Sequence, residues 1–384
     1  VLLSNPMQLK LFADAYIESG RKFKSKNSIY SQAINRLAKE HNESVSLPEI
    51  PLSVEEKVQF ASEVFAKLLL SGAEGVTKSE ANANNLYPDL VSLVRCKKQI
   101  THILATQLFK PSDMEGSHRP VHKIITEYAA ADYLIKRTED ENDSLTLSGC
   151  LAIIAPNSAV RLGLRGLLGW MASLGNTHTQ KTLIKLDPYA VLSNGDCSRL
   201  DNSSKLLMLG CLQETAENNP YFRRSDLFRR FSVTDFFTDD IIYQTKELIQ
   251  RNSKNHLRNL LLELLVGSSA VEKLTEELSK ILHSKDEDER SRQLAHNCLI
   301  EQRNDYDYKP DLECLIDEGS HISLRIAAVA IEKLGQQTFN TEYLSNFFRK
   351  CANLRPGSDK LDGILAIRLY IKLLIANLNI ETTM

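Results

Sequence analysis

The sequence predicts a mainly all-α protein, with a helical domain and a winged helix followed by a HEAT-like α-solenoid. Apolar residues recur at helical spacing along most of the chain, and three helical segments repeat at a nearly constant period. Ahead of these repeats, several helices and a short hairpin are expected within about 90 residues. We therefore divide the chain into a helical domain (1–46), a winged-helix-like domain (47–138) and a helical-repeat region (139–384).

The first predicted helix begins at Asn5 and Pro6 and ends at Gly20. Asparagine caps helices, proline favours the first helical position, and glycine commonly follows a helix end. A basic loop, residues 21–26, leads to a second helix predicted over residues 28–40. The two helices form the predicted helical domain.

The predicted winged-helix domain starts with a helix whose caps can be read directly. Ser53 and Glu56 have the spacing of a capping box, and Gly72 marks the helix end. Short pieces follow, with a hairpin expected at residues 100–109 because of their β-branched and apolar content. A strong helix is predicted over residues 120–137.

The charged segment 137–143 is predicted to be the main domain boundary, and the helical repeats lie beyond it. Three similar segments align on Arg258, Arg292 and Arg325, which are 34 and then 33 residues apart. Other helices are expected between the copies, over residues 270–283 and 311–318. Two helices per unit at this period are typical of an α-solenoid.

Bulk composition points to a cytoplasmic globular protein of 384 residues with a net charge of −2, so no global field attracts it to nucleic acid or membrane. The seven cysteines are odd in number and contain no CxxC pair, which indicates reduced thiols and no zinc ribbon. The longest uncharged run, 144–160, is interrupted by Gly149 and Pro156, so we expect no membrane span.

No complete catalytic motif occurs in the sequence, and we expect this chain to have no catalytic residues. The nearest approach to a phosphate-binding loop, residues 72–79, lacks the Gly-Lys-Ser/Thr sequence and is interpreted as a helix stop followed by a new cap. His118 and His122 have the spacing of metal ligands on one helix face, but no further ligand accompanies them. We therefore expect no metal site.

Two segments, 222–224 and 228–231, combine arginine with phenylalanine. Such pairs can stack on bases and bind phosphates. The favoured interpretation is an amphipathic helix with phenylalanines in the core and arginines in solvent. Nucleic acid is therefore the weaker alternative as a partner.

Several motifs resemble the part of NACHT-type signalling NTPases (STAND ATPases) that follows the nucleotide-binding core. Residues 121–134, VHKIITEYAAADYL, are similar to the family helix His-Arg-x-x-x-Glu-Tyr-Leu-Ala-Ala-x-Tyr-Leu, which closes the winged-helix domain. Residues 5–11, NPMQLKL, resemble the Asn-Pro-Leu-x-Leu motif that opens the helical domain. Residues 164–171, 187–188 and 194–196 resemble the helical region of bacterial members. The sequence departs from the family at Ile-Ile-Thr, where a phenylalanine usually precedes the glutamate.

This resemblance implies a switch between an ADP-closed and an ATP-open state, with magnesium and nucleotide bound mainly by a core that this sequence does not contain. It implies that His122 approaches the ADP phosphate and that Pro6 lies near the nucleotide. Walker A and Walker B motifs are absent, so the chain alone is not expected to hydrolyse ATP, whereas the full-length protein is. A protein trigger or effector, homo-oligomerisation on activation and a role in bacterial anti-phage defence are also implied.

The alternative interpretation is a free-standing HEAT-like scaffold that binds a protein or nucleic acid. It depends on the repeat period alone and treats the NACHT-like motifs as coincidence.

Overall fold

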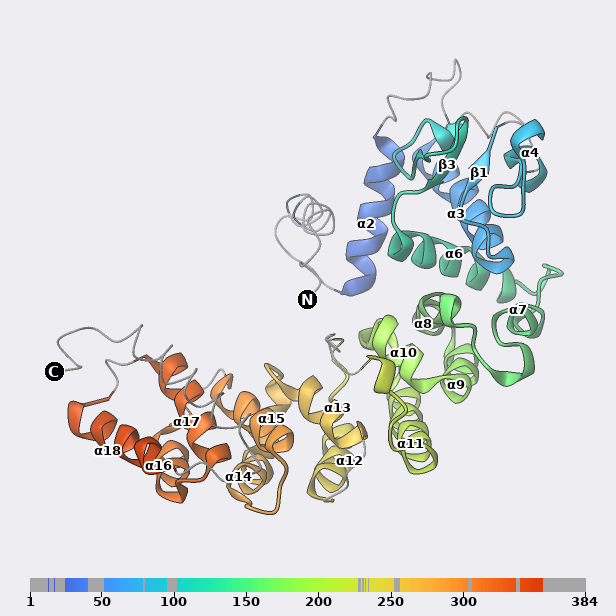
Figure 1. Cartoon of the computed structure of the whole chain (residues 1–384). Helices are drawn as coiled ribbons and strands as arrows, with labels where there is room; N and C mark the ends of the chain where they lie inside the picture. Colours follow the sequence, from blue (N-terminus) through green and yellow to red (C-terminus); the bar gives the residue numbers. More distant parts are fainter. Residues whose placement is uncertain are drawn as a thin grey trace. The chain divides into compact units, whose positions relative to one another are not determined.

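The computed structural model describes residues 13, 17, 25–40, 52–78, 80–94, 102–226, 229, 231, 233, 235–251, 256–302, 306–335 and 339–354. These residues are mainly helical, which confirms the coarse fold class (Figure 1). Two compact units are formed, one from Val1–Asn218 with Asp226–Ile241 and the other from Asn219–Ser225 with Ile242–Met384. The helix predicted at residues 5–20 lies outside the described residues, apart from Ala13 and Ile17, which are helical.

The first unit contains nine described α-helices and one three-stranded sheet. Its elements are α2 (Lys26–Lys39), α3 (Val54–Ser71), β1 (Val76–Thr77), η1 (Glu80–Asn82), α4 (Leu90–Leu93), β2 (Phe109–Pro111), β3 (Ser117–Pro120), α6 (Lys123–Thr138), α7 (Leu147–Ile154), η2 (Pro156–Ser158), η3 (Leu162–Leu164), α8 (Arg165–Leu174), α9 (Thr177–Leu186), α10 (Pro188–Asn194), η4 (Cys197–Arg199) and α11 (Asn202–Asn218).

Helix α3 has the caps that the sequence predicts. The Ser53 hydroxyl accepts a hydrogen bond from the Glu56 amide at 3.2 Å, and the Glu56 carboxylate accepts one from the Ser53 amide at 2.9 Å. Gly72 ends the helix with a φ of 80°, a conformation that glycine adopts without a steric penalty. Both helix boundaries are therefore confirmed.

The sheet has the strand order β1-β3-β2, and both pairings are antiparallel. The hairpin predicted at residues 100–109 is displaced along the chain, because residues 102–104 are helical and the paired strands are β2 and β3. Gly116, with a φ of 73°, and a hydrogen bond from the Ser112 amide to the Ser117 carbonyl allow the turn between these two strands. Turn geometry therefore places the hairpin, rather than β-branched content.

Helix α6 packs against α3 on one side and against α8 on the other (Figure 1). The predicted helix over 120–137 is confirmed as α6, three residues later at its start. Arg137 makes two hydrogen bonds of 2.7 Å to Asp143, and this segment, predicted to be the main boundary, lies within the first compact unit.

Lys26 belongs to α2 rather than to the predicted basic loop. Its ammonium group donates to the carbonyl oxygens of Asn194 and Gly195 at 3.0 and 2.8 Å, and lies 5.1 Å from the centre of the Trp170 ring. Burial lowers the pKa of Lys26. This lysine therefore attaches α2 to the C-terminal end of α10, while residues 21–24 lie outside the described part of the chain.

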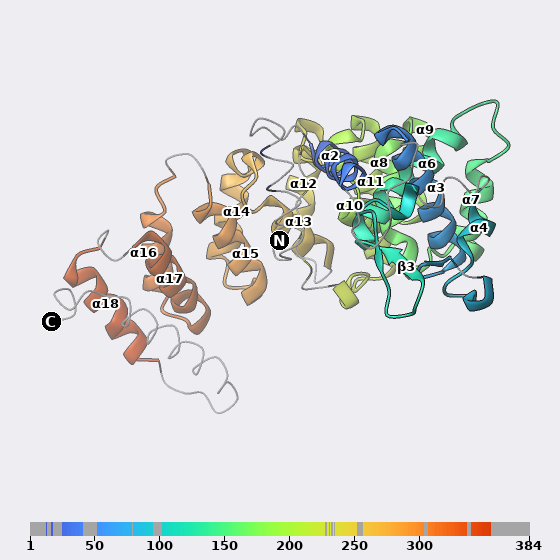
Figure 2. The same cartoon turned by 90° about the horizontal axis from the view of Figure 1, so that it is seen from above.

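The second unit consists of successive helices that pack as neighbours (Figure 2). The three repeated segments are α13, α15 and α17, and the helices expected between them are η6 with α14, and α16. In both η5 (Arg224–Asp226) and α12 (Asp239–Gln250) the chain passes between the two units. The other described helices of the second unit are α13 (His256–Leu265), η6 (Ser269–Leu274), α14 (Thr275–His283), α15 (Glu289–Ile300), α16 (Lys309–Glu318), α17 (His321–Leu334) and α18 (Thr341–Ala352).

Candidate functional site

His122 lies at the junction between the small sheet and α6, where the extended backbone after β3 turns into the helix. It is the N-cap residue, with a φ of −154°, whereas the helix predicted over residues 120–137 would have placed it in the first turn. Its Nδ1 accepts a hydrogen bond from the Ile124 amide at 3.2 Å, and its carbonyl accepts one from the Thr126 amide. The local sequence therefore fixes the imidazole at the start of α6.

The capping hydrogen bond also determines which nitrogen of His122 carries the proton in the neutral ring. Because Nδ1 is an acceptor, the hydrogen lies on Nε2, which makes Nε2 a donor. Partial burial lowers the pKa of His122, and the charge of Lys110 lowers it further. A neutral imidazole is therefore favoured until an anion approaches it.

Two further basic side chains lie close to this junction. Lys110 on β2 and Arg119 on β3 are directly opposite each other in the antiparallel register. Like charges in such a pair disfavour the hairpin. Within the described ranges, no carboxylate forms an ion pair with either residue. With the N-terminus of α6 they form a positively polarised surface, which we call the His122 junction.

The other predicted site residues are not brought to this junction. Pro6 lies outside the described residues. His118 is buried in β3 and His122 caps α6, so the two histidines do not share a helix face. The described residues hold no group of three or more potential metal ligands.

The glycines of residues 72–79, the segment that approaches a phosphate-binding loop in sequence, are explained by backbone conformation and packing. After Gly72 the chain forms β1, where a new helix cap was expected. A Cβ added to Gly75 would lie 2.3 Å from the carbonyl oxygen of His118. Gly75 is therefore required by close packing between backbone segments.

Glu127 is an ionisable group that the sequence analysis did not single out. Its side chain is 6% exposed, and a Cβ added to Gly166 would lie 2.2 Å from one of its carboxylate oxygens. Burial raises its pKa to about 7, against the attraction of the Lys123 ammonium group 3.7 Å away. The position of this glutamate among the apolar residues of the inner helix face could have indicated from the sequence that its carboxyl group is buried.

The arginine–phenylalanine segments are engaged in internal contacts. Arg223 is fully buried and donates to Glu263 at 2.8 Å. Arg229 donates to the side chain of Asn194 at 2.7 Å and lies over the ring of Phe231. The expected amphipathic helix with solvent-facing arginines is therefore wrong for Arg223, whose charge is paired inside the second unit.

Two of the three aligned arginines form the same buried structure in successive repeats. Arg258 donates from Nε to the Ile249 carbonyl at 2.7 Å and makes two hydrogen bonds of 2.6 Å to Glu287. This arginine joins the end of the preceding helix to the next repeat. We call the arrangement a buried arginine staple.

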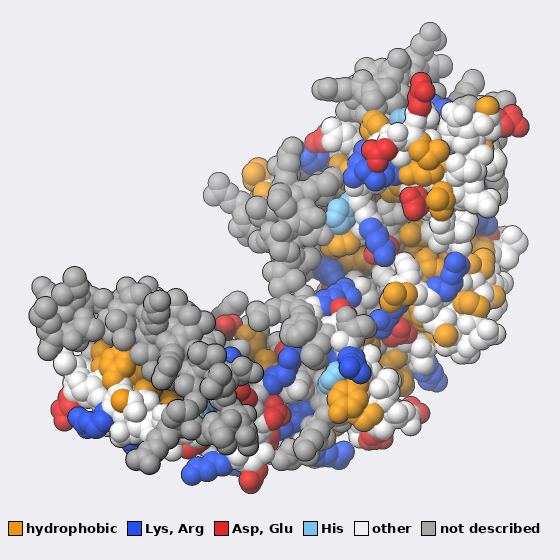
Figure 3. Space-filling model, viewed as in Figure 1, with side chains coloured by type: hydrophobic (Ala, Val, Ile, Leu, Met, Phe, Trp, Pro, Cys, Tyr) orange, Lys and Arg blue, Asp and Glu red, His pale blue; other side chains and the backbone are white. Residues whose placement is uncertain are grey.

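Arg292 makes the second staple. It donates from Nε to the Leu282 carbonyl at 2.8 Å and makes two hydrogen bonds to Glu318, at 3.0 and 2.6 Å. Arg325 departs from this pattern, because it is about one-third exposed and pairs with Glu289. Figure 3 shows basic and acidic side chains interspersed on the described surface, as further ion pairs between neighbouring helices require.

Comparisons with protein-family models and with curated protein sequences find no match for this chain. Among the described helices, none combines the length and the apolar character needed to cross a membrane.

Proposed function

We propose that this chain is the regulatory and sensor portion of a NACHT-type (STAND) ATPase that switches between an ADP-closed and an ATP-open state. The His122 junction carries this proposal. A neutral imidazole whose Nε2 is a donor, two basic side chains opposite each other on β2 and β3, and a helix N-terminus are together suited to a phosphate group. We assign the ADP phosphate to this junction and Pro6 to the same nucleotide.

The first unit supports this assignment through its architecture. A three-stranded antiparallel sheet precedes α6, and the centre of the Phe109 ring on β2 lies 4.9 Å from that of the Phe65 ring on α3, which is the arrangement expected of a winged helix. We propose that this winged helix holds the nucleotide in the closed state. Nucleotide exchange would then release it, with homo-oligomerisation and signalling in bacterial anti-phage defence as the result.

The second unit supports a sensor role, because the same buried arginine–glutamate ion pair joins successive helix pairs. Buried arginine staples at Arg258 and Arg292 attach each helix pair to the next. Such nearest-neighbour stapling suits a HEAT-like solenoid, whose extended surface can meet a protein trigger. The same observation favours the second candidate function, a HEAT-like scaffold without nucleotide.

The deciding experiment uses the complete protein with its nucleotide-binding core. His122→Leu should lower ADP retention during purification and give signalling without a trigger, because the Nε2 donor is lost. His178→Leu, at an exposed position of α9, is the matched control and should leave both properties unchanged. Unchanged ADP content and unchanged basal signalling in His122→Leu would favour the scaffold.

A further inference from the structure

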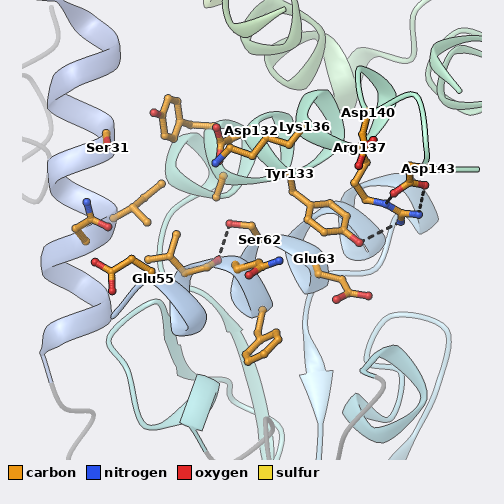
Figure 4. A pocket seen from close by; sticks show the side chains of 17 residues that line it. Ser31, Glu55, Ser62, Glu63, Asp132, Tyr133, Lys136, Arg137, Asp140 and Asp143 are labelled. Carbon is orange, nitrogen blue, oxygen red and sulfur yellow. Dashed lines mark hydrogen bonds and ion pairs between the residues drawn. The ribbon is translucent and has the colours of Figure 1, made fainter. Parts of the chain in front are cut away.

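A groove of about 790 Å³ lies between α2, α3 and α6 (Figure 4). None of the residues that line it belongs to the His122 junction. Ile34, Val58 and Ala129 give it apolar surface, and the rings of Tyr128 and Tyr133 add aromatic surface. We call it the α2–α3–α6 groove. Its volume lies within the range of sites that enclose a ligand or a short peptide segment.

Carboxylate side chains line the groove on both of its sides. Glu55 and Glu63 project from α3, and Asp132 and Asp140 lie on the opposite wall (Figure 4). The two members of each pair are eight residues apart in sequence. Glu55 and Glu63 both belong to α3, so about 12 Å of helix separates them, whereas Asp140 follows the end of α6. A complementary ligand therefore needs positive charges at two separated points.

One guanidinium group is already held at the end of the groove by its own side chains. Arg137 lies over the ring of Tyr133, with its carbon 5.6 Å from the ring centre, and donates to the tyrosine oxygen at 3.1 Å. Its two hydrogen bonds to Asp143 complete the contact. The contact shows that a carboxylate and a tyrosine ring of this groove together can bind a basic side chain.

The groove keeps an excess of negative charge after its internal pairs are formed. Five carboxylates and two basic side chains line it. Asp132 pairs with Lys136 at 2.6 Å, and Glu63 pairs with Lys67 at 2.7 Å. In the described part of the chain, no ion pair involves Glu55 or Asp140. Asp140 accepts hydrogen bonds from the backbone and side-chain amides of Asn142, but neither its negative charge nor that of Glu55 is balanced by a basic side chain among the described residues.

We propose that the α2–α3–α6 groove binds a basic peptide segment of a partner protein, with one lysine or arginine side chain directed to Glu55 and another to Asp140. The length of the groove along α3, about 12 Å from Glu55 to Glu63, is matched by positions i and i+8 of a helical peptide. The apolar and aromatic lining suits the body of a peptide rather than a bare amine. This inference goes beyond the nucleotide switch and does not depend on it.

The test measures peptide binding to the full 384-residue chain by calorimetry. The probe is an alanine-based helical peptide with two lysines eight positions apart, and its control has glutamines in their place. The groove variant combines Glu55→Gln with Asp140→Asn. The matched control combines Glu214→Gln with Glu247→Gln, two exposed carboxylates on α11 and α12, so both variants lose the same charge. Melting curves establish that both remain folded.

The lysine peptide should bind, the glutamine peptide should not, and the groove variant should bind about fivefold more weakly while the matched control is unchanged. Added salt should weaken binding because the contacts are exposed. Equal loss of affinity in the two variants would overturn the proposal, as would no binding of the lysine peptide. Spermine binding as tightly as the peptide would overturn the assignment to a peptide.

Discussion

Glu127 shows how strongly one buried carboxyl group can depend on pH. Its folded-state pKa is raised by burial to about 7, above the ordinary value of 4.5. The folded state therefore binds a proton more tightly than the unfolded state. The resulting stabilisation is complete below about pH 4.5 and is lost as the pH rises through 7.

We predict that Glu127→Gln removes this pH dependence. Between pH 4.5 and 7.5 the unchanged protein should lose about 3 kcal/mol of stability that the variant keeps, an order-of-magnitude value from the pKa shift. Urea unfolding followed at several pH values measures the difference. Parallel stability curves for the two proteins would contradict the assigned pKa.

His122 provides a second residue-scale test, because Lys110 is one of the causes of its lowered pKa. We predict that Lys110→Glu raises the pKa of His122 and stabilises the hairpin by about 0.5 kcal/mol, since an opposite-charge pair with Arg119 replaces a like-charge pair. In the complete protein the same substitution should weaken ADP retention.

The measurement is an NMR titration of the histidine side chains, with His178 as an internal control on the exposed surface of α9. A His122 titration that does not move would show that Lys110 is too far away to act on it. Increased ADP retention in this variant would argue against an anion at the His122 junction.

Helix ends in the first unit could be predicted well because their signals are local. Ser53, Glu56 and Gly72 cap α3 through contacts within a few residues. The environment of Glu127 could not be predicted, because Gly166 encloses it from a helix about 40 residues further along. The hairpin was misplaced for a different reason, because its position depends on the local turn at Gly116, which the β-branched content of residues 100–109 does not indicate.

At the scale of elements, the repeat period predicted the helices of the second unit but not the role of its arginines. Alignment placed Arg258, Arg292 and Arg325 in equivalent positions. The first two are buried and pair with a carboxylate 29 and 26 residues further along the chain, whereas Arg325 is about one-third exposed and pairs with Glu289. Sequence spacing alone does not distinguish a buried arginine from an exposed one.

We predict that replacing a buried arginine costs much more free energy of unfolding than replacing the exposed one. Arg292→Ala leaves Glu318 buried without its partner and should destabilise the second unit by about 3 kcal/mol. The Arg292 hydrogen bonds, opposed by burial, hold the pKa of Glu318 below its ordinary value, so the carboxylate stays charged. Arg325→Ala, the matched control at an exposed pair, should cost less than about 1 kcal/mol.

Chemical denaturation of the two variants under the same conditions measures this contrast. Equal destabilisation by the two substitutions would mean that the buried staple contributes no more than a surface ion pair. A double substitution of Arg292 and Glu318 by apolar residues should recover part of the loss, because no unpaired buried charge remains.

For the whole molecule, the sequence indicated the succession of helices, whereas the division into two compact units depends on contacts between distant segments. Residues 219–225 belong with the second unit although residues 226–241 return to the first. Arg223 illustrates this exchange, because its buried charge is paired with Glu263, 40 residues away. The α2–α3–α6 groove likewise combines three helices from separate parts of the sequence.

The two units should unfold separately, and the chain contains a probe that distinguishes them. Trp170 is the single tryptophan, and it is buried in the first unit against the rings of Tyr30 and Tyr128. Tryptophan fluorescence therefore reports the first unit, whereas helical circular dichroism reports both. We predict that Arg292→Ala moves part of the dichroism transition to lower denaturant and leaves the fluorescence transition in place. Glu127→Gln at pH 8 should shift the fluorescence transition upward. If both transitions move together in both variants, the two units unfold as one cooperative structure. A substitution in either unit then changes the free energy of unfolding of both.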